Sequence, residues 1–348
     1  TPVLIGSFNL LVASLILWYF PDRLTRPRIL NAQFIALFLV SVLAFAVAKP
    51  IILYGEQHKY KDKIIYQEQT RYQKIVVTQW KDDYWLFING STQFSTYDEE
   101  RYHEPLVHPL MGLIKERKDI LLLGGGDGLA AREILKYPDL ENLTLVDLDP
   151  AMTRLARQDK IFLGINQGSL NDPRVRVVNQ DAYQFIKNSG DLYDAVIIDL
   201  PDPKSVSLSL LYSLGFYKMV EKHLKPFGAM VTQSTSPLYS PEAFLCIKKT
   251  MEAAGFSTVP YQNSVPSMGQ WGWVIGVRHE AMPAQRLKQE LLMLGFADIE
   301  TRFLNRDAMI SMAHFGKGLF EKEASIEPNT QFDHNILKYY RQGNWDVY

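Results

Sequence analysis

The chain has 348 residues, of which 47% are hydrophobic and 22% charged, and its formal net charge is −1. This composition excludes a disordered protein, and the lack of a basic surplus argues against nucleic-acid binding. The single cysteine, Cys246, excludes an intrachain disulfide framework, and the seven histidines show no spacing typical of a metal site.

Two apolar stretches begin the chain. Residues 1–20 and 30–53 each approach the length that a helix needs to cross a bilayer, and a short basic segment, 21–28, separates them. We expect residues 1–53 to form two transmembrane helices. The alternatives are two buried helices of a soluble protein and a cleaved signal peptide, for which no cleavage site is evident. Because the first residue is Thr1, we expect a fragment with further spans upstream.

A small N-terminal β domain is predicted for residues 54–110. Short alternating runs at 64–69, 72–79 and 84–88 are separated by polar turns, which is typical of an antiparallel sheet. Asn89 and Gly90 both tolerate positive φ, so they predict a tight hairpin turn.

Residues 111–315 follow another pattern, in which a buried strand, a turn and a helix alternate. This pattern predicts an α/β fold with a doubly wound, Rossmann-like sheet. The predicted strands cover residues 120–123, 143–148, 175–178, 195–198 and 229–232, and residues 271–277 are predicted to add an antiparallel edge strand. Residues 316–348 form a C-terminal tail.

A nucleoside site is predicted at the strand ends of this sheet. The glycine-rich loop 124–128 follows the first strand, so a ligand can approach its backbone closely. Acids end the next two strands, where a ribose diol and an adenine edge are commonly bound. The predicted residues are Gly124, Gly126, Asp127, Asp147, Asp181 and Ala182. In the alternative interpretation, the acids only cap the following helices.

The acids also narrow the choice of ligand. The sequence has no P-loop, and Asp127 would repel a pyrophosphate, so we expect an adenosyl sulfonium compound in preference to NAD. The fourth strand ends in Asp199, with Asp202 just beyond, and the ends of parallel strands share one crevice. Clustered carboxylates favour a cation such as a diamine, although Asp and Pro also form ordinary turns.

Several motifs in combination resemble the spermidine synthase family of aminopropyltransferases. They are Tyr72-Gln73, Gln93, Asp98-Glu99, Tyr102-His103-Glu104, the 124–128 loop, and Asp199 with Asp202-Pro203. The resemblance runs from about residue 54 to 315. The apolar N-terminal segment, residues 265–272 and the tail look like the membrane-fused branch of that family.

The resemblance implies decarboxylated S-adenosylmethionine as aminopropyl donor and co-substrate, with no prosthetic group, and a diamine such as putrescine as acceptor. Asp199 matches the family's proton acceptor, and Tyr102 lies beside the amine groups. The residues implied to contact the nucleoside part of the donor are Gln73, Asp147, Asp181 and Ala182. Those implied to contact the amine groups are His103, Asp127, Asp199 and Asp202. No metal is required, because the leaving thioether is neutral.

Two departures from the family pattern fall on the acceptor side. Lys204-Ser205-Val206-Ser207 replaces the usual Gly-Pro-Ala after Asp202-Pro203, and the late loop 266–269 is shorter and lacks a tyrosine commonly placed there. We therefore expect weak selectivity among diamines. The acceptor should still be cationic, because no lysine or arginine in these motifs neutralises the acids.

Two other functions stay open. A methyltransferase shares the fold and the adenosine site, but Asp127 would repel the carboxylate of S-adenosylmethionine and attract the amine of the decarboxylated donor. A non-catalytic, membrane-bound polyamine-binding module is the third interpretation. Because the donor is made inside cells, we expect a multi-pass protein of the inner membrane whose catalytic part faces the cytoplasm. The oligomeric state stays open, with a homodimer as one candidate.

Overall fold

The computed structural model describes residues 2–20 and 27–345. The chain forms two compact units, which are Thr1–Ile65 with Thr78–Trp80 and Tyr66–Val77 with Lys81–Tyr348. Each unit is described by itself below.

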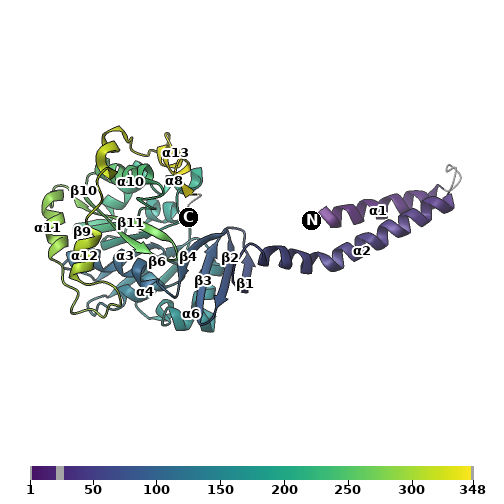
Figure 1. The fold of residues 1–348 in the computed structure, drawn as a ribbon, viewed down its shortest axis with the longest axis horizontal. Coiled ribbons are helices and arrows are strands. Elements are labelled where there is room, and N and C mark those ends of the chain that lie inside the picture. The colour runs from purple at the N-terminus through teal and green to yellow at the C-terminus, as the bar shows by residue number, and fades with distance from the viewer. Residues whose placement is uncertain (1, 21–26, 346–348) are drawn as a thin grey trace. The chain divides into compact units, whose positions relative to one another are not determined.

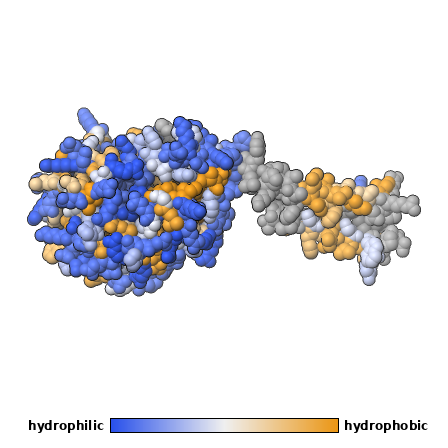
Figure 2. All heavy atoms as spheres, turned by 90° about the horizontal axis from the view of Figure 1, so that it is seen from below, coloured by the Kyte–Doolittle hydropathy of each residue, from blue (hydrophilic) through white to orange (hydrophobic). Residues whose placement is uncertain are grey.

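The first unit contains α1 (Pro2–Tyr19) and α2 (Pro27–Gln57), which pack against each other (Figure 1). Their described side chains are mostly apolar and exposed (Figure 2). The two predicted helices are therefore confirmed.

The prediction that these helices cross a membrane is not supported. Among the residues described, no helix is both long and apolar enough to span a bilayer.

The small antiparallel sheet predicted for residues 54–110 is present, with strand order β1-β2-β3-β4. Its strands are β1 (Lys63–Gln69), β2 (Lys74–Trp80), β3 (Asp83–Ile88) and β4 (Ser91–Ser95). Ile88 pairs with Ser91 across the predicted hairpin turn, where Asn89 and Gly90 have φ of 51° and 81°. The sequence analysis missed β4, because its five residues are mostly small and polar.

The predicted doubly wound sheet is also present, with seven strands in the order β10-β11-β9-β8-β5-β6-β7. The strands are β5 (Asp119–Gly124), β6 (Asn142–Asp147), β7 (Val175–Asn179), β8 (Tyr193–Asp199), β9 (Leu224–Gln233), β10 (Phe256–Val265) and β11 (Gly269–Arg278). Strands β5 to β9 pair in parallel.

One strand prediction needs correction. The late strand, β11, is antiparallel as expected, but it lies between β9 and β10 and is not the edge. The edge strand is β10, which the sequence analysis missed because Pro260 interrupts a run of mixed polarity. Proline is tolerated on an edge strand, where one side of the backbone has no partner strand.

Helices cover both faces of this sheet. The helices are α3 (Glu100–Leu113), α4 (Leu129–Ile134), α5 (Pro150–Gln158), α6 (Lys160–Ile165), α7 (Ala182–Asn188), α8 (Val206–Leu210), α9 (Leu214–Lys222), α10 (Pro241–Ala253), α11 (Ala284–Met293), α12 (Arg306–Met312) and α13 (Asn335–Arg341), with 3-10 helices η2 (Ser169–Asn171) and η3 (Leu319–Ser325). Leu121 and Val196 pack with α7, α9, α10 and α13 in one core cluster, whereas Ile120 and Ile197 are buried on the opposite face. Since successive strand residues alternate between faces, both faces carry apolar side chains.

This topology brings distant acids to one edge of the sheet. Gly124 at the end of β5 pairs with Asp199 at the end of β8, and Asp147 at the end of β6 pairs with Asn179. Ligands of open α/β sheets bind outside the carboxyl ends of the strands. The strand-end acids that the sequence analysis assigned to a site therefore lie at one edge of the sheet.

Candidate active site

The glycine loop after β5 is shaped by close backbone approach. Gly124, Gly125 and Gly128 have φ of 87°, 69° and 88°, in the left-handed region that favours glycine. A Cβ atom at Gly124 would overlap the carbonyl oxygen of Asp199, and one at Gly126 would overlap the carboxylate of Asp147. The glycines thus let the first strand end directly against both acids.

Asp147 is held by backbone donors at the end of β6. Its carboxylate accepts hydrogen bonds from the backbone N–H of Gly126 at 3.1 Å and of Asp149 at 2.8 Å. Burial raises the pKa of Asp147 to about 6, against the opposing effect of these hydrogen bonds. The carboxylate therefore has a fixed orientation beside the glycine loop.

Gln73 belongs to a turn that is tied to the same strand end. Thr70 Oγ1 donates to Asp149 Oδ2 at 2.8 Å and accepts from the backbone N–H of Gln73 at 3.0 Å. This turn between β1 and β2 is thereby anchored beside β6. The geometry is consistent with a nucleoside site formed by both segments.

Asp181 caps helix α7, as the alternative interpretation of the strand-end acids proposed. Its side chain accepts from the backbone N–H of Gln184 at 2.9 Å and is exposed, whereas Ala182 is buried. A capping role does not exclude ligand contact, because the carboxylate has a second oxygen.

Tyr102 and Asp199 are joined by a short hydrogen bond inside the site. The Tyr102 hydroxyl, on buried helix α3, donates to Asp199 Oδ1 at 2.7 Å. Burial raises the pKa of Asp199 to about 6, and Asp127 adds to this rise, whereas the charge of His103 and the Tyr102 hydrogen bond oppose it. The same burial and the Asp199 charge raise the pKa of Tyr102 well above its usual value. At neutral pH, Asp199 is thus a carboxylate that can accept a proton.

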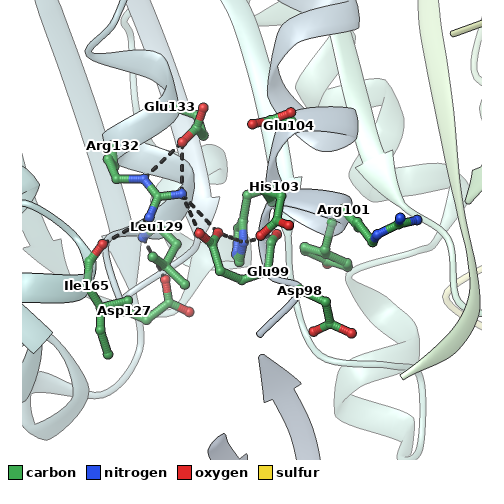
Figure 3. Close-up of polar contacts among 12 residues, drawn as sticks. Asp98, Glu99, Arg101, His103, Glu104, Asp127, Leu129, Arg132, Glu133 and Ile165 are labelled. Atoms are coloured by element: carbon green, nitrogen blue, oxygen red, sulfur yellow. Dashed lines mark hydrogen bonds and ion pairs between the residues drawn. The ribbon is translucent and has the colours of Figure 1, made fainter. Parts of the chain in front are cut away.

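Behind this pair lies a buried ion network (Figure 3). His103 Nδ1 lies 3.1 Å from Glu99 Oε2, and Arg132 donates to Glu99 at 2.9 Å and to Glu133 at 2.9 Å. Burial by itself lowers the pKa of His103, but the hydrogen bond and charge of Glu99 outweigh it and raise the pKa to about 9. His103 is therefore a cation at neutral pH, although only 2% of it is exposed.

Asp127 lies next to this network, beside the start of α4. Its Oδ1 accepts from the backbone N–H of Leu129 at 2.8 Å (Figure 3). Burial raises the pKa of Asp127, while the charges of His103 and Arg132 oppose the rise. The sequence analysis considered only lysine and arginine within the motifs, so it missed that His103 and Arg132 partly balance Asp127.

Asp202 is held by residues from distant parts of the chain. Tyr340 from α13 donates its hydroxyl to Asp202 Oδ2 at 2.9 Å, and Gln233 Nε2 lies 3.5 Å from Oδ1. Burial raises the pKa of Asp202, and the charge of Lys204 and the Tyr340 hydrogen bond oppose it. Lys204 itself donates to Ser91 Oγ at 2.7 Å. A basic residue therefore moderates this acid as well.

Two buried side chains fix the backbone of residues 199–203, which we call the acidic loop. The Tyr212 hydroxyl donates to the carbonyl oxygens of Leu200 and Pro201 at 3.0 and 3.1 Å, and Gln233 Nε2 donates to the Leu200 carbonyl at 2.6 Å. Thr235, just after β9, has a φ of 56°, which is rare for a β-branched residue. Such strain concentrates at functional sites, where the surrounding structure holds it in place.

The late loop between β10 and β11 is tied to the start of α3. Asp98 accepts from the backbone N–H of Ser267 at 2.6 Å and from its hydroxyl at 2.7 Å. Tyr261, the tyrosine nearest to this loop in β10, is fully buried, donates to the Pro105 carbonyl at 2.8 Å and stacks on Trp273. Tyr261 is therefore a core residue and does not replace the missing late-loop tyrosine.

The structure thus unites Tyr102, His103, Asp127 and Asp199, and it adds residues to the site that sequence reasoning missed. Those residues are Arg132, Tyr212, Gln233 and Tyr340. Arg132 follows the glycine loop by one helical turn, so its position offered a signal. Tyr340 offered none, because it lies 138 residues from Asp202 in the chain.

Comparisons with known proteins identify the family of the chain. A family model described as the spermine/spermidine synthase domain matches residues 99–289. A polyamine aminopropyltransferase of Oceanobacillus iheyensis is 39% identical over 353 residues, which cover 100% of this chain and 66% of that relative. Polyamine aminopropyltransferase 2 of Ralstonia nicotianae is 37% identical over 348 residues, covering 98% of this chain and 66% of the relative.

The chain thus spans slightly less than two thirds of the length of these curated relatives. Among solved structures, the spermidine synthase from Thermotoga maritima has a TM-score of 0.65 and 24% identity, and the match covers 76% of this chain and 88% of that chain. At this level of identity the likeness establishes a shared fold.

Proposed function

The chain belongs to the spermine/spermidine synthase family, and we propose that it transfers an aminopropyl group from decarboxylated S-adenosylmethionine to a diamine. With putrescine as acceptor, the products are spermidine and methylthioadenosine. The observation that carries the proposal is the buried Tyr102–Asp199 pair, 2.7 Å apart, at the strand edge that also holds the glycine loop.

Asp199 serves as the proton acceptor in this reaction. An aliphatic amine has a pKa of about 10 and is mostly protonated at neutral pH, so it must lose a proton to become a nucleophile. The pKa of Asp199, raised to about 6, leaves a carboxylate that is more basic than an ordinary aspartate and still ionised at neutral pH. Tyr102 holds one of its oxygens, which orients the other.

The chemical step needs no group beyond these residues and the two substrates. The nitrogen lone pair attacks the propyl carbon next to the sulfonium, the carbon–sulfur bond breaks, and its electron pair neutralises the sulfur. The proton on nitrogen passes to Asp199. Most of the remaining rate gain comes from alignment of the two substrates in the site.

Asp127 favours the decarboxylated donor. The amine of this donor is attracted by a buried carboxylate, whereas the carboxylate of S-adenosylmethionine would be repelled. Gln73, Asp147 and the start of α7 at Asp181 and Ala182 are proposed to contact the nucleoside part. A methyltransferase, the runner-up, would show the opposite preference between the two donors.

The experiment that tests this proposal is incubation of the protein with each donor and a panel of amines, with products identified by mass spectrometry. We expect methylthioadenosine and an aminopropylated amine from the decarboxylated donor alone. A methylated product would identify a methyltransferase. Binding of polyamine without any product would identify a non-catalytic module.

The location of the protein is a separate proposal. We propose that α1 and α2 attach the protein to the inner membrane and that the second unit, which holds the candidate active site and is called the catalytic unit below, faces the cytoplasm. Support comes from apolar side chains such as Phe8 and Trp18, which are 65% and 77% exposed. Protease treatment of right-side-out vesicles should leave the catalytic unit intact, and its digestion would contradict the proposal. A homodimer stays a prediction that light scattering would test.

A further inference from the structure

The C-terminal tail, residues 316–345 in the described chain, is an integral part of the catalytic unit. Asn329 is fully buried, and its side-chain amide donates to the carbonyl oxygens of Ser209 at 2.8 Å and Tyr212 at 3.1 Å. Ile336 of α13 belongs to the main core cluster, and α13 packs against α10 and α8 (Figure 1). This tail lies outside the range matched by the family domain, 99–289.

The tail delivers a tyrosine hydroxyl to an acid of the site. Tyr340 donates to Asp202 Oδ2 at 2.9 Å and is only 6% exposed. Its position is fixed by Trp345, whose indole N–H donates to the Tyr340 carbonyl oxygen at 2.8 Å and whose ring centroid lies 4.5 Å from that of Tyr340. The phenol is therefore held rigidly against the acidic loop.

The same tail residues reach the late loop through Tyr239. The backbone N–H of Asn344 donates to the Tyr239 carbonyl at 2.7 Å, and the rings of Tyr239 and Trp345 lie 5.9 Å apart. Tyr239 in turn packs so closely on Gly269 that a Cβ atom there would lie 2.6 Å from its hydroxyl oxygen. Tyr340, Trp345 and Tyr239 thus connect the acidic loop to the late loop.

We propose that Tyr340 is a specificity-determining residue for the acceptor, supplied by the tail in place of the tyrosine that the late loop lacks. This inference rests on the proposed aminopropyl transfer. Tyr340 occupies Oδ2 of Asp202, so Oδ1, whose contact with Gln233 Nε2 is long at 3.5 Å, is left for the ammonium of a diamine. A hydrogen bond between an ammonium and a carboxylate is charge-assisted and short, so it would outcompete that long contact.

The aromatic residues beside Asp202 also limit the acceptor. An amine that extends past Asp202 toward α13 would meet the ring of Tyr340, which is buried and packed against Trp345 and therefore cannot move aside cheaply. We therefore expect a preference for short diamines, in place of the weak selectivity expected from the late loop alone.

The test compares Tyr340→Phe with the wild-type full chain and with Tyr339→Phe. The first variant keeps the ring that packs against Trp345 and removes only the hydroxyl. The control removes a neighbouring hydroxyl of α13, which accepts from the backbone N–H of Glu327 at 3.2 Å and does not contact Asp202. Kinetic constants for the donor, putrescine and a longer diamine are measured for all three proteins.

We expect Tyr340→Phe to raise the KM for putrescine about tenfold, since a hydrogen bond to a charged group is lost. The KM for the donor, and kcat, should stay within about twofold, in line with a residue that acts on the acceptor alone. The Tyr340 hydrogen bond lowers the pKa of Asp202. Without this hydrogen bond the pKa of Asp202 should rise. Protonation of Asp202, which weakens putrescine binding, should therefore occur at higher pH in the variant than in the wild type. A merely structural role of Tyr340 would not produce this shift. Tyr339→Phe should behave as wild type.

A second variant covers the case in which Tyr340→Phe folds poorly. A Cβ atom at Gly343 would lie 2.7 Å from Trp345 Nε1 and 2.8 Å from the Tyr239 carbonyl oxygen, so Gly343→Val should displace Trp345 and admit longer diamines. If the wild type transfers aminopropyl groups and both variants keep its acceptor KM and selectivity, the role of Tyr340 is refuted and the proposed function stands. Equal changes in donor and acceptor KM would also refute it. If the wild type itself transfers no aminopropyl group to any amine, the proposed function fails.

Discussion

The buried His103 cation makes the stability of the catalytic unit depend on pH, and this dependence is predictable. Its pKa rises from 6.5 in the unfolded chain to about 9 in the folded protein, chiefly because Glu99 outweighs the effect of burial. A group whose pKa is raised on folding stabilises the protein fully below the unfolded pKa and loses that contribution as pH rises through the folded pKa. The relevant window therefore runs from pH 6.5 to 9.

The size of the effect follows from the shift. Each pKa unit corresponds to about 1.4 kcal/mol, so His103 contributes on the order of 3 kcal/mol at pH below 6.5 and almost nothing well above pH 9. His103→Gln removes the titrating group and keeps a side-chain N–H for Glu99. We expect the free energy of unfolding of the wild type to decrease by this amount as the pH rises through the window. The variant should lack this decrease.

Urea unfolding of the wild type and the variant at pH steps from 6.5 to 9 measures the effect as a difference between the two proteins. Glu99→Gln serves as a second variant, and it should also flatten the slope because Glu99 is the main source of the raised pKa. Equal pH slopes in wild type and His103→Gln would refute the assignment of a cationic His103.

Three further predictions concern the site. Asp199→Asn should keep the wild-type unfolding curve and lower kcat about a hundredfold or more. In the wild type, kcat/KM should decrease as the pH drops below about 6, the pKa of the Asp199 carboxyl. Near-normal turnover by the variant would remove Asp199 from the mechanism. The wild type should bind the decarboxylated donor about tenfold or more tightly than S-adenosylmethionine, and Asp127→Ala should shrink this gap in calorimetry; equal wild-type affinities would contradict the role of Asp127. Gly126→Ala should weaken donor binding about tenfold, because the added methyl group displaces Asp147. Gly164→Ala is the control, since its methyl group meets no atom within 4 Å. Equal donor affinities of Gly126→Ala and the wild type would show that Asp147 does not hold the donor.

The sequence by itself determined that a small antiparallel sheet is followed by a doubly wound α/β sheet. Strand ends at Asp147 and Asp199 were predictable, because buried parallel strands are continuous apolar runs that stop where polar residues begin. The hairpin at Asn89 and Gly90 was predictable because few residues adopt positive φ at low cost. The local pattern of apolar and polar residues thus specified the strand end at which each acid lies.

Membrane crossing was a weaker inference, since it depends on the length and apolarity of the whole helix. Strand β10 was missed because Pro260 and its polar neighbours read locally as a loop, and only pairing with β11 makes them a strand. Local composition did not decide whether a helix crosses a membrane or whether a segment is a loop or a strand. Those outcomes depend on the whole helix and on the pairing of the strand.

Only the tertiary structure decided the charge state and the acceptor side of the site. His103 becomes a cation because folding places Glu99 within hydrogen-bond distance of it, and the hydrogen bond and charge of Glu99 outweigh the opposing effect of burial. Tyr340 reaches Asp202 because α13 packs on the core 138 residues along the chain. No periodicity or spacing in a single sequence records such a contact, since it depends on how separate elements pack and not on the residues next to it.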